Sequence, residues 1–281
     1  MLDVRHDHSH VATLSNESIS PLAPFSALII TISAVIIFLI RLYVLESWLL
    51  PRLYGSKYTD LSDTNRRSFV NHHVAGGTKL VLLFSGAYPF ISMAFGHGTP
   101  HSPFGPSHLT TLGDVAMVCS QIFTVMYIFE LFYRTAISPI SAAHHIGAIV
   151  IAQTAVALTL GYAHDRDATD EFILCLVWGA FDVVAEFYPH VAMIIYRVRH
   201  DDHLLLERIF KVTCGLEVAG TVIETAVVMW LFGSLWSKWR LAFKVVTPVL
   251  HVLFSLAQIW GAVIFNRLRL REKEKRKSAL V

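Results

Sequence analysis

Acidic and histidine side chains recur at helical spacing inside otherwise apolar stretches of this sequence. Asp182, Glu186 and His190 follow one another at intervals of four residues, which places them along one face of a helix. Glu130 and Arg134 are also four residues apart, in the order that favours an ion pair between successive helical turns. Side chains of these types can exchange protons, pair with one another or bind the polar part of a ligand.

Two further apolar stretches carry polar residues at a similar spacing. Glu217 and Glu224 are seven residues apart, and His251 and Gln258 have the same separation. Ionisable side chains are costly in lipid and normally face the interior of a helix bundle or a wet cavity. The repeated pattern therefore predicts a polar cavity inside the protein. The alternative is that these groups only form hydrogen bonds between helices, each contributing about 0.6–2 kcal/mol.

The adjacent histidines His144 and His145 follow Pro139 at the start of another apolar stretch. Successive helical residues point about 100° apart, so both rings cannot bind one metal ion from a regular helix. We expect one ring to face the cavity and the other to contact a neighbouring helix. The sequence contains no HxxHH or HExxH motif, and we expect no metal. A histidine beside a buried carboxylate would suit general-base or nucleophilic catalysis on a lipid acyl group.

The composition indicates that these residues belong to a membrane protein. The chain has 281 residues, of which 54% are hydrophobic and only 16% are charged, whereas soluble domains are about 25% charged. A membrane-spanning helix needs about 20 mostly apolar residues, and about seven stretches meet this condition. We therefore predict an all-α, polytopic transmembrane bundle. The predicted spans are 25–50, 74–95, 113–134, 142–163, 171–196, 209–236 and 241–266.

Basic residues alternate between the two ends of these predicted spans. The connectors after the first and fifth spans and the C-terminal tail are rich in Lys and Arg, whereas the loop 96–112 has none. Because cytosolic loops carry more Lys and Arg, we expect a lumenal N-terminus and a cytosolic C-terminus. On this side assignment Asn16, in Asn-Glu-Ser, is a candidate for lumenal N-glycosylation.

The chain divides accordingly into a membrane domain with short tails. We predict a lumenal N-terminal tail over 1–24, a first transmembrane helix over 25–50, a membrane domain over 66–267 and a basic cytosolic tail over 268–281. With a net charge of +2, the sequence offers no nucleic-acid-binding surface. Membrane lipids are the expected partners, and the sequence leaves open whether the chain forms a homodimer.

The segment YIFELFYRTAISPISAAHHIGAIV, from Tyr127 to Val150, precedes the pair Asp182-x-x-x-Glu186. Together they resemble the TLC domain, which is named for the translocating-chain-associating membrane protein, the longevity-assurance ceramide synthases and a neuronal-lipofuscinosis protein. The resemblance covers about residues 66–267. It implies residence in the endoplasmic reticulum and the binding or handling of a lipid in the intramembrane cavity, without a bound cofactor.

The ceramide synthases are the enzymatic branch of this family. The resemblance to them implies an acyl transfer with acyl-CoA as co-substrate, in which His144 or His145 acts and Asp182 orients it. Ceramide synthases also carry a His-Asp pair shortly before the Asp-x-x-x-Glu pair, but this sequence has Trp178 and Gly179 there. The departure favours lipid binding, and an N-acyltransferase of ceramide-synthase type in sphingolipid synthesis is the alternative.

Two other classes of membrane protein fit the sequence less well. A seven-helix photoreceptor would need a lysine in the middle of the last span, but Lys244 lies near its beginning. A trafficking adaptor would need longer cytosolic loops than those predicted here.

Overall fold

The computed structural model describes residues 10–14, 18–106, 108–161 and 167–279, and within these residues it contains helices and no β-strand. Seven helical stretches are long and apolar enough to cross a membrane, which confirms the predicted all-α bundle. All seven are wider than or shifted from the predicted spans, but none is missing. The stretches are Ala23–Tyr54, Asp63–Ala94, Leu112–Tyr133, Pro139–Leu160, Ala168–Val198, His203–Ser234 and Leu241–Ser278.

The first span consists of several helical pieces that continue into one another. A 3₁₀ turn η2 (Ala23–Phe25) leads into α1 (Ser26–Leu39), which becomes the π-helix η3 (Ile40–Leu49) and then α2 (Leu50–Tyr54). A short helix α3 (Ser56–Thr59) follows the turn at Gly55, whose φ of 55° suits a residue without a side chain. A further 3₁₀ turn, η1 (His10–Thr13), precedes the span.

Three helices then form the centre of the bundle: α4 (Asp63–Ala94), α5 (Leu112–Tyr133) and α6 (Pro139–Leu160). Thr111 and Asp114 form a reciprocal capping box at the start of α5. Ser138 caps α6, whose first residue is Pro139, a position where a missing N–H costs nothing. The connection from Gly96 to Thr111 is irregular where it is described, as predicted.

The fifth span is broken into α7 (Ala168–Ala185) and α8 (Phe187–Val198), with Glu186 at the junction. The last two spans are the long helices α9 (His203–Ser234) and α10 (Leu241–Ser278). At about 1.5 Å per residue, the 38 residues of α10 extend well beyond a bilayer core of about 30 Å. The basic segment predicted to be a separate tail from residue 268 therefore continues the last helix as far as Ser278.

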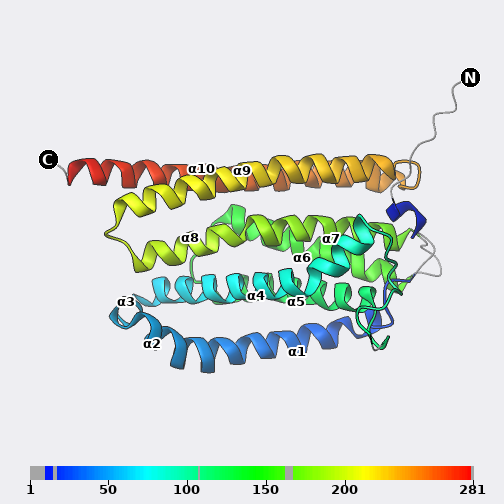
Figure 1. Ribbon diagram of the computed structural model, residues 1–281, viewed down its shortest axis with the longest axis horizontal. Coiled ribbons are helices and arrows are strands. Elements are labelled where there is room, and N and C mark those ends of the chain that lie inside the picture. Colours follow the sequence, from blue (N-terminus) through cyan, green and yellow to red (C-terminus); the bar gives the residue numbers. More distant parts are fainter. Residues whose placement is uncertain (1–9, 15–17, 107, 162–166, 280–281) are drawn as a thin grey trace, which may run out of the picture.

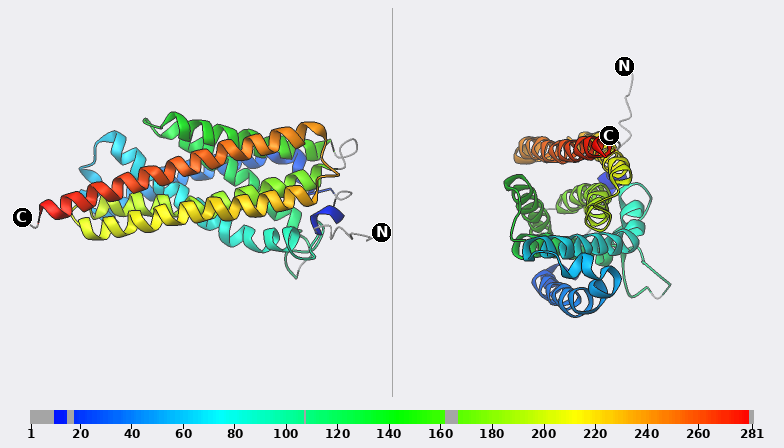
Figure 2. Two further views of the ribbon diagram at one scale, coloured as in Figure 1. Left: turned by 90° about the horizontal axis from the view of Figure 1, so that it is seen from above. Right: turned by 90° about the vertical axis from the view of Figure 1, so that its left-hand side faces the viewer.

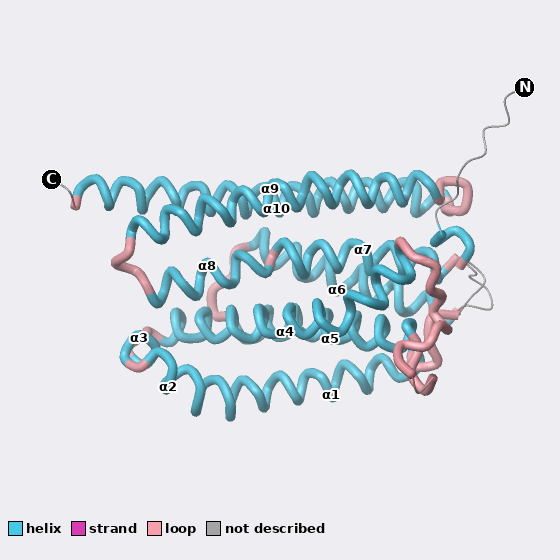
Figure 3. Tube along the Cα trace, in the orientation of Figure 1, coloured by secondary structure: helices cyan, strands magenta, loops and turns pink. Residues whose placement is uncertain are grey.

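The helices run nearly parallel to one long axis, and the loops gather at its two ends (Figure 3). α9 and α10 lie side by side on one side of the bundle, the first span lies on the opposite side, and α4 to α8 lie between them (Figures 1 and 2). One end holds residues 50–62, 199–202 and the end of α10, and we call it the basic end. The candidate glycosylation residue Asn16 lies outside the described residues.

One span separates residues 50–62 from the loop 96–111, and three spans separate that loop from residues 199–202, so the basic end and the loop should lie on opposite sides of the membrane. Leu109 and Asp201 are suitable reporters, because each side chain is 88% exposed. In sealed microsomes, Asp201→Cys should react with a membrane-impermeant maleimide directly, whereas Leu109→Cys should react only after the membrane is permeabilised. Labelling of both cysteines from the same side would contradict seven spans.

Candidate functional site

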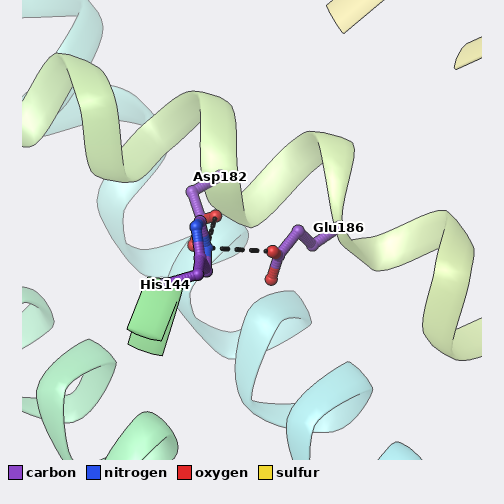
Figure 4. A group of neighbouring side chains, drawn as sticks. All are labelled: His144, Asp182 and Glu186. Carbon is purple, nitrogen blue, oxygen red and sulfur yellow. Dashed lines mark hydrogen bonds and ion pairs between the residues drawn. The ribbon is translucent and has the colours of Figure 1, made fainter. Parts of the chain in front are cut away.

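Three of the predicted site residues meet in the interior of the bundle. The Nε2 atom of His144, on α6, lies 3.3 Å from Asp182 Oδ1 and 3.1 Å from Glu186 Oε1 (Figure 4). Asp182 is on the last turn but one of α7, and Glu186 is at the junction with α8. The side chains of His144 and Asp182 are buried, and that of Glu186 is partly buried. The four-residue spacing of the two carboxylates thus directs both of them at one imidazole ring.

A lysine that the sequence interpretation missed is part of the same group. Lys79, on α4, is 1% exposed, and its Nζ lies 3.1 Å from Glu186 Oε2 and 3.6 Å from Asp182 Oδ2. It also donates a hydrogen bond of 3.1 Å to the main-chain oxygen of Asp182. A lysine in the middle of an apolar span is itself unusual, and this signal alone could have identified it.

Tyr127, on α5, completes what we call the central polar group: Lys79, Tyr127, His144, Asp182 and Glu186. The Tyr127 hydroxyl donates a hydrogen bond to Asp182 and lies 3.0 Å from Glu186 Oε2. The ring of His145 packs against the Tyr127 ring at 4.4 Å between centroids. His145 therefore contacts α5, whereas His144 Nε2 faces the two carboxylates.

The charges of the central polar group balance when His144 carries a proton. Two carboxylates then face one ammonium and one imidazolium. Buried ions are tolerated only where opposite charges and hydrogen bonds replace their hydration, and each carboxylate here has several such partners. His144 Nε2 faces the carboxylates, whereas its Nδ1 is buried and has no hydrogen-bond partner in the described part of the chain.

His144, Asp182 and Glu186 also offer three ligand atoms that lie within 4.8 Å of one another. A cation at this point would have to sit beside the Lys79 ammonium, which already pairs with both carboxylates. Electrostatic repulsion by Lys79 therefore disfavours a divalent metal at this point.

A mainly apolar cavity of about 360 Å³ lies beside the central polar group. This volume falls in the usual range of small-molecule sites. Asp182 belongs to its wall, whereas within the described residues neither His144 nor His145 does, so the prediction that one histidine faces the cavity is not confirmed. Three wall residues, Leu83, Ile91 and Val184, are more than 40% exposed, so the cavity is open to the outside of the bundle.

The carboxylate of Glu224 and the amide of Gln258 also line this cavity, and they form a hydrogen bond of 2.7 Å. Glu217, seven residues before Glu224 on α9, does not line the cavity. It lies between α9 and α10 beside Gly261, where a Cβ atom added to the glycine would come within 3.2 Å of the Glu217 carboxylate. Of the two predicted acidic residues on α9, only Glu224 therefore lines the cavity.

His251, on α10, contacts the position where the sequence departs from the ceramide-synthase pattern. The indole N–H of Trp178 donates a hydrogen bond of 3.0 Å to His251 Nδ1, and the two rings are nearly parallel. His251 Nε2 lies 3.0 Å from the Thr225 hydroxyl. Both ring nitrogens of His251 are thus occupied, so its role here is structural.

Three predicted residues, Glu130, Arg134 and His190, lie outside the central polar group. The ion pair between Arg134 and Glu130 is present at 2.6 Å, as expected. His190 was predicted to share a stripe with Asp182 and Glu186, but it does not reach the central polar group. Its Nδ1 instead lies 3.0 Å from Nδ1 of His72, on α4, and both rings are buried. The break at Glu186 separates His190 from α7, which accounts for this different partner.

The fold and the site define a multi-pass membrane protein with a buried polar group beside an apolar cavity. Comparisons of the chain with family models, with curated proteins and with solved structures found no significant match. The functional assignment below therefore depends on the residues of this chain and on the motif described above.

Replacing Lys79 by Met should destabilise the protein by about 3–5 kcal/mol, because it leaves two buried carboxylates without their ammonium partner. The free energy of unfolding can be measured by titration with a denaturing detergent. Adding Asp182→Asn should recover part of the loss.

The matched control is Lys211→Met, since Lys211 is exposed on α9 and its replacement should change the free energy of unfolding by no more than about 0.5 kcal/mol. Equal stability of the Lys79→Met variant and the unaltered chain would mean that the ammonium does not compensate the carboxylates.

Proposed function

We propose that this chain is a TLC-domain protein of the endoplasmic reticulum that binds a lipid in its intramembrane cavity. The observation that carries the proposal is the amphipathic character of the cavity. Its wall is almost entirely apolar, but it includes Asp182, which belongs to a buried, charged hydrogen-bonding group. An acyl chain fits the apolar wall, and a lipid hydroxyl, amide or carbonyl group fits the polar end.

Access from the bilayer supports a lipid rather than a water-soluble ligand. The exposed wall residues Leu83 and Ile91 are on α4, and Val184 is on α7, all within spans. A lipid can therefore enter sideways between helices without passing through water. Gly86 on α4, which has no side chain, and the small Ala152 on α6 leave room for the cavity, where larger residues would fill it.

Filling the cavity should remove the bound lipid. We expect Ala152→Phe to lower the amount of lipid that copurifies with the protein by at least about tenfold, because the new ring occupies the space of several methylene groups. Native mass spectrometry of the purified protein measures this directly.

Val150→Phe is the matched control, since Val150 is on the same helix but is 56% exposed and does not line the cavity. This variant should keep its lipid. If the unaltered chain carries no lipid, or if both variants keep it, the cavity is not a lipid site.

One observation favours acyl transfer as a second candidate function. His144 Nε2 faces the two carboxylates, so in the neutral ring this nitrogen carries the hydrogen and Nδ1 keeps a free lone pair. A histidine oriented by a carboxylate is the arrangement of a general base. Asp182 is then the orienting residue, and Lys79 Nζ lies 3.6 Å from its Oδ2.

The corresponding reaction transfers an acyl group from acyl-CoA to an amine. His144 Nδ1 accepts a proton from the amine while the nitrogen forms a bond to the thioester carbonyl carbon. The carbon–sulfur bond then breaks, and the sulfur leaves with the electron pair and takes the proton from His144. The products are an amide and free CoA, and no further reactant is needed.

His144→Ala should lower such an activity by about 10²–10⁴-fold, the usual contribution of a general base. The measurement uses membranes supplied with a sphingoid base and acyl-CoA, with His200→Ala as control, because the His200 side chain is 63% exposed at the basic end. Absence of amide from the unaltered protein would reject acyl transfer and leave lipid binding untouched.

A further inference from the structure

A second polar cavity, of about 670 Å³, lies at the basic end of the bundle, apart from the central polar group. It is bordered by η3, α3, the beginning of α4 and the end of α5. Three arginines line it: Arg41, Arg66 and Arg67. The carboxylates in its wall are those of Glu46 and Asp63, so the wall carries one more positive than negative charge.

The arginines keep hydrogen-bond donors free although each has an acidic partner. Arg41 contacts Glu46 at 3.2 Å through one terminal nitrogen, and its Nε is buried without a partner in the part of the chain that is described. Arg66 and Arg67 share the single carboxylate of Asp63, at 3.1 and 3.0 Å. A guanidinium has five N–H donors, so an anion that enters the cavity would find several of them unused.

The π-helix η3 builds this cavity. In a π-helix, residues five apart lie above one another, and Arg41 and Glu46 have this spacing. Glu46 also accepts a hydrogen bond from the Tyr133 hydroxyl at the end of α5. The Arg41 guanidinium lies 5.0 Å from the ring centroids of both Phe38 and Tyr133. Arg41 is therefore held in place before any ligand binds.

The surroundings of the cavity point to the surface of a membrane. Phe38, Tyr43 and Trp48, on the same stretch, are 48%, 65% and 55% exposed. Aromatic side chains of this kind collect at the level of the lipid headgroups, and Arg66 and Arg67 reach that level from α4 with side chains about two-fifths exposed. A headgroup phosphate beside the first span would lie next to all three arginines.

We propose that this cavity binds the phosphate group of an anionic phospholipid. Planar guanidinium groups pair with phosphate oxygens through two parallel hydrogen bonds. The exposed aromatic side chains of the first span would contact the glycerol and acyl region of the same molecule, which a free phosphate ion lacks. The bound lipid would connect the first span to α4 and α5.

Native mass spectrometry of the full chain in detergent, with phosphatidic acid and phosphatidylcholine as competing probes, tests this site. Arg41→Gln should weaken phosphatidic acid binding about fivefold, the effect of removing one basic residue from an anionic surface. Glu46→Gln should strengthen it, because it removes a negative charge from the cavity. Both variants break the Arg41–Glu46 pair, so a purely structural role would weaken binding in both.

Arg271→Gln is the control of equal charge, because Arg271 is exposed on the distal part of α10 at the same end, and it should bind as the unaltered chain does. Equal binding by all three variants, or weaker binding by Glu46→Gln, would overturn the proposal. Displacement of phosphatidic acid by inorganic phosphate at a comparable concentration would reject the lipid and leave a simple anion site.

Discussion

The contact of Lys79 with Asp182 and Glu186 is the interaction on which the middle of the bundle depends. Two carboxylates between apolar helices are tolerated only where positive charges stand directly beside them. Lys79 supplies one such charge from α4, and His144 can supply another from α6. Because each partner is on a different helix, the requirement for charge balance also fixes the relative depth and rotation of α4, α6 and α7.

The sequence predicted those features that depend on one helix at a time. Span number follows from the lengths of apolar runs, and the Glu130–Arg134 pair follows from spacing along a single helix. The spacing pattern could not identify Lys79 and Tyr127 as partners of Asp182 and Glu186, since Lys79 is 107 residues from Glu186 and Tyr127 is 55 residues from Asp182. Such contacts depend on how helices are rotated against one another, and periodicity carries no information on that.

In the fifth span, a break in the helix gives residues of one predicted stripe different partners. The spacing of Asp182, Glu186 and His190 predicts one continuous stripe, and this would hold for a straight helix. The structure ends α7 before Glu186 and starts α8 after it, so the first two residues meet His144 while His190 meets His72. The prediction of one continuous stripe assumed a regular helix, and that assumption was wrong. Pro189, three residues after Glu186, signals the break, because a proline has no N–H to donate to the carbonyl of Ala185 and its ring clashes with that carbonyl.

The position of the charges relative to the cavity explains how a mainly apolar cavity and a buried ionic group can lie side by side in one bundle. Of the central polar group, only Asp182 reaches the cavity wall, and its charge is already paired with Lys79 and His144. One helical turn before Asp182, the indole of Trp178 lines the cavity and donates a hydrogen bond to His251. The wall there is a neutral aromatic surface, which an acyl chain can cover without stripping water from an ion. Among the residues of α7 that line the cavity, Asp182 is therefore the charged one that the polar end of a ligand would meet.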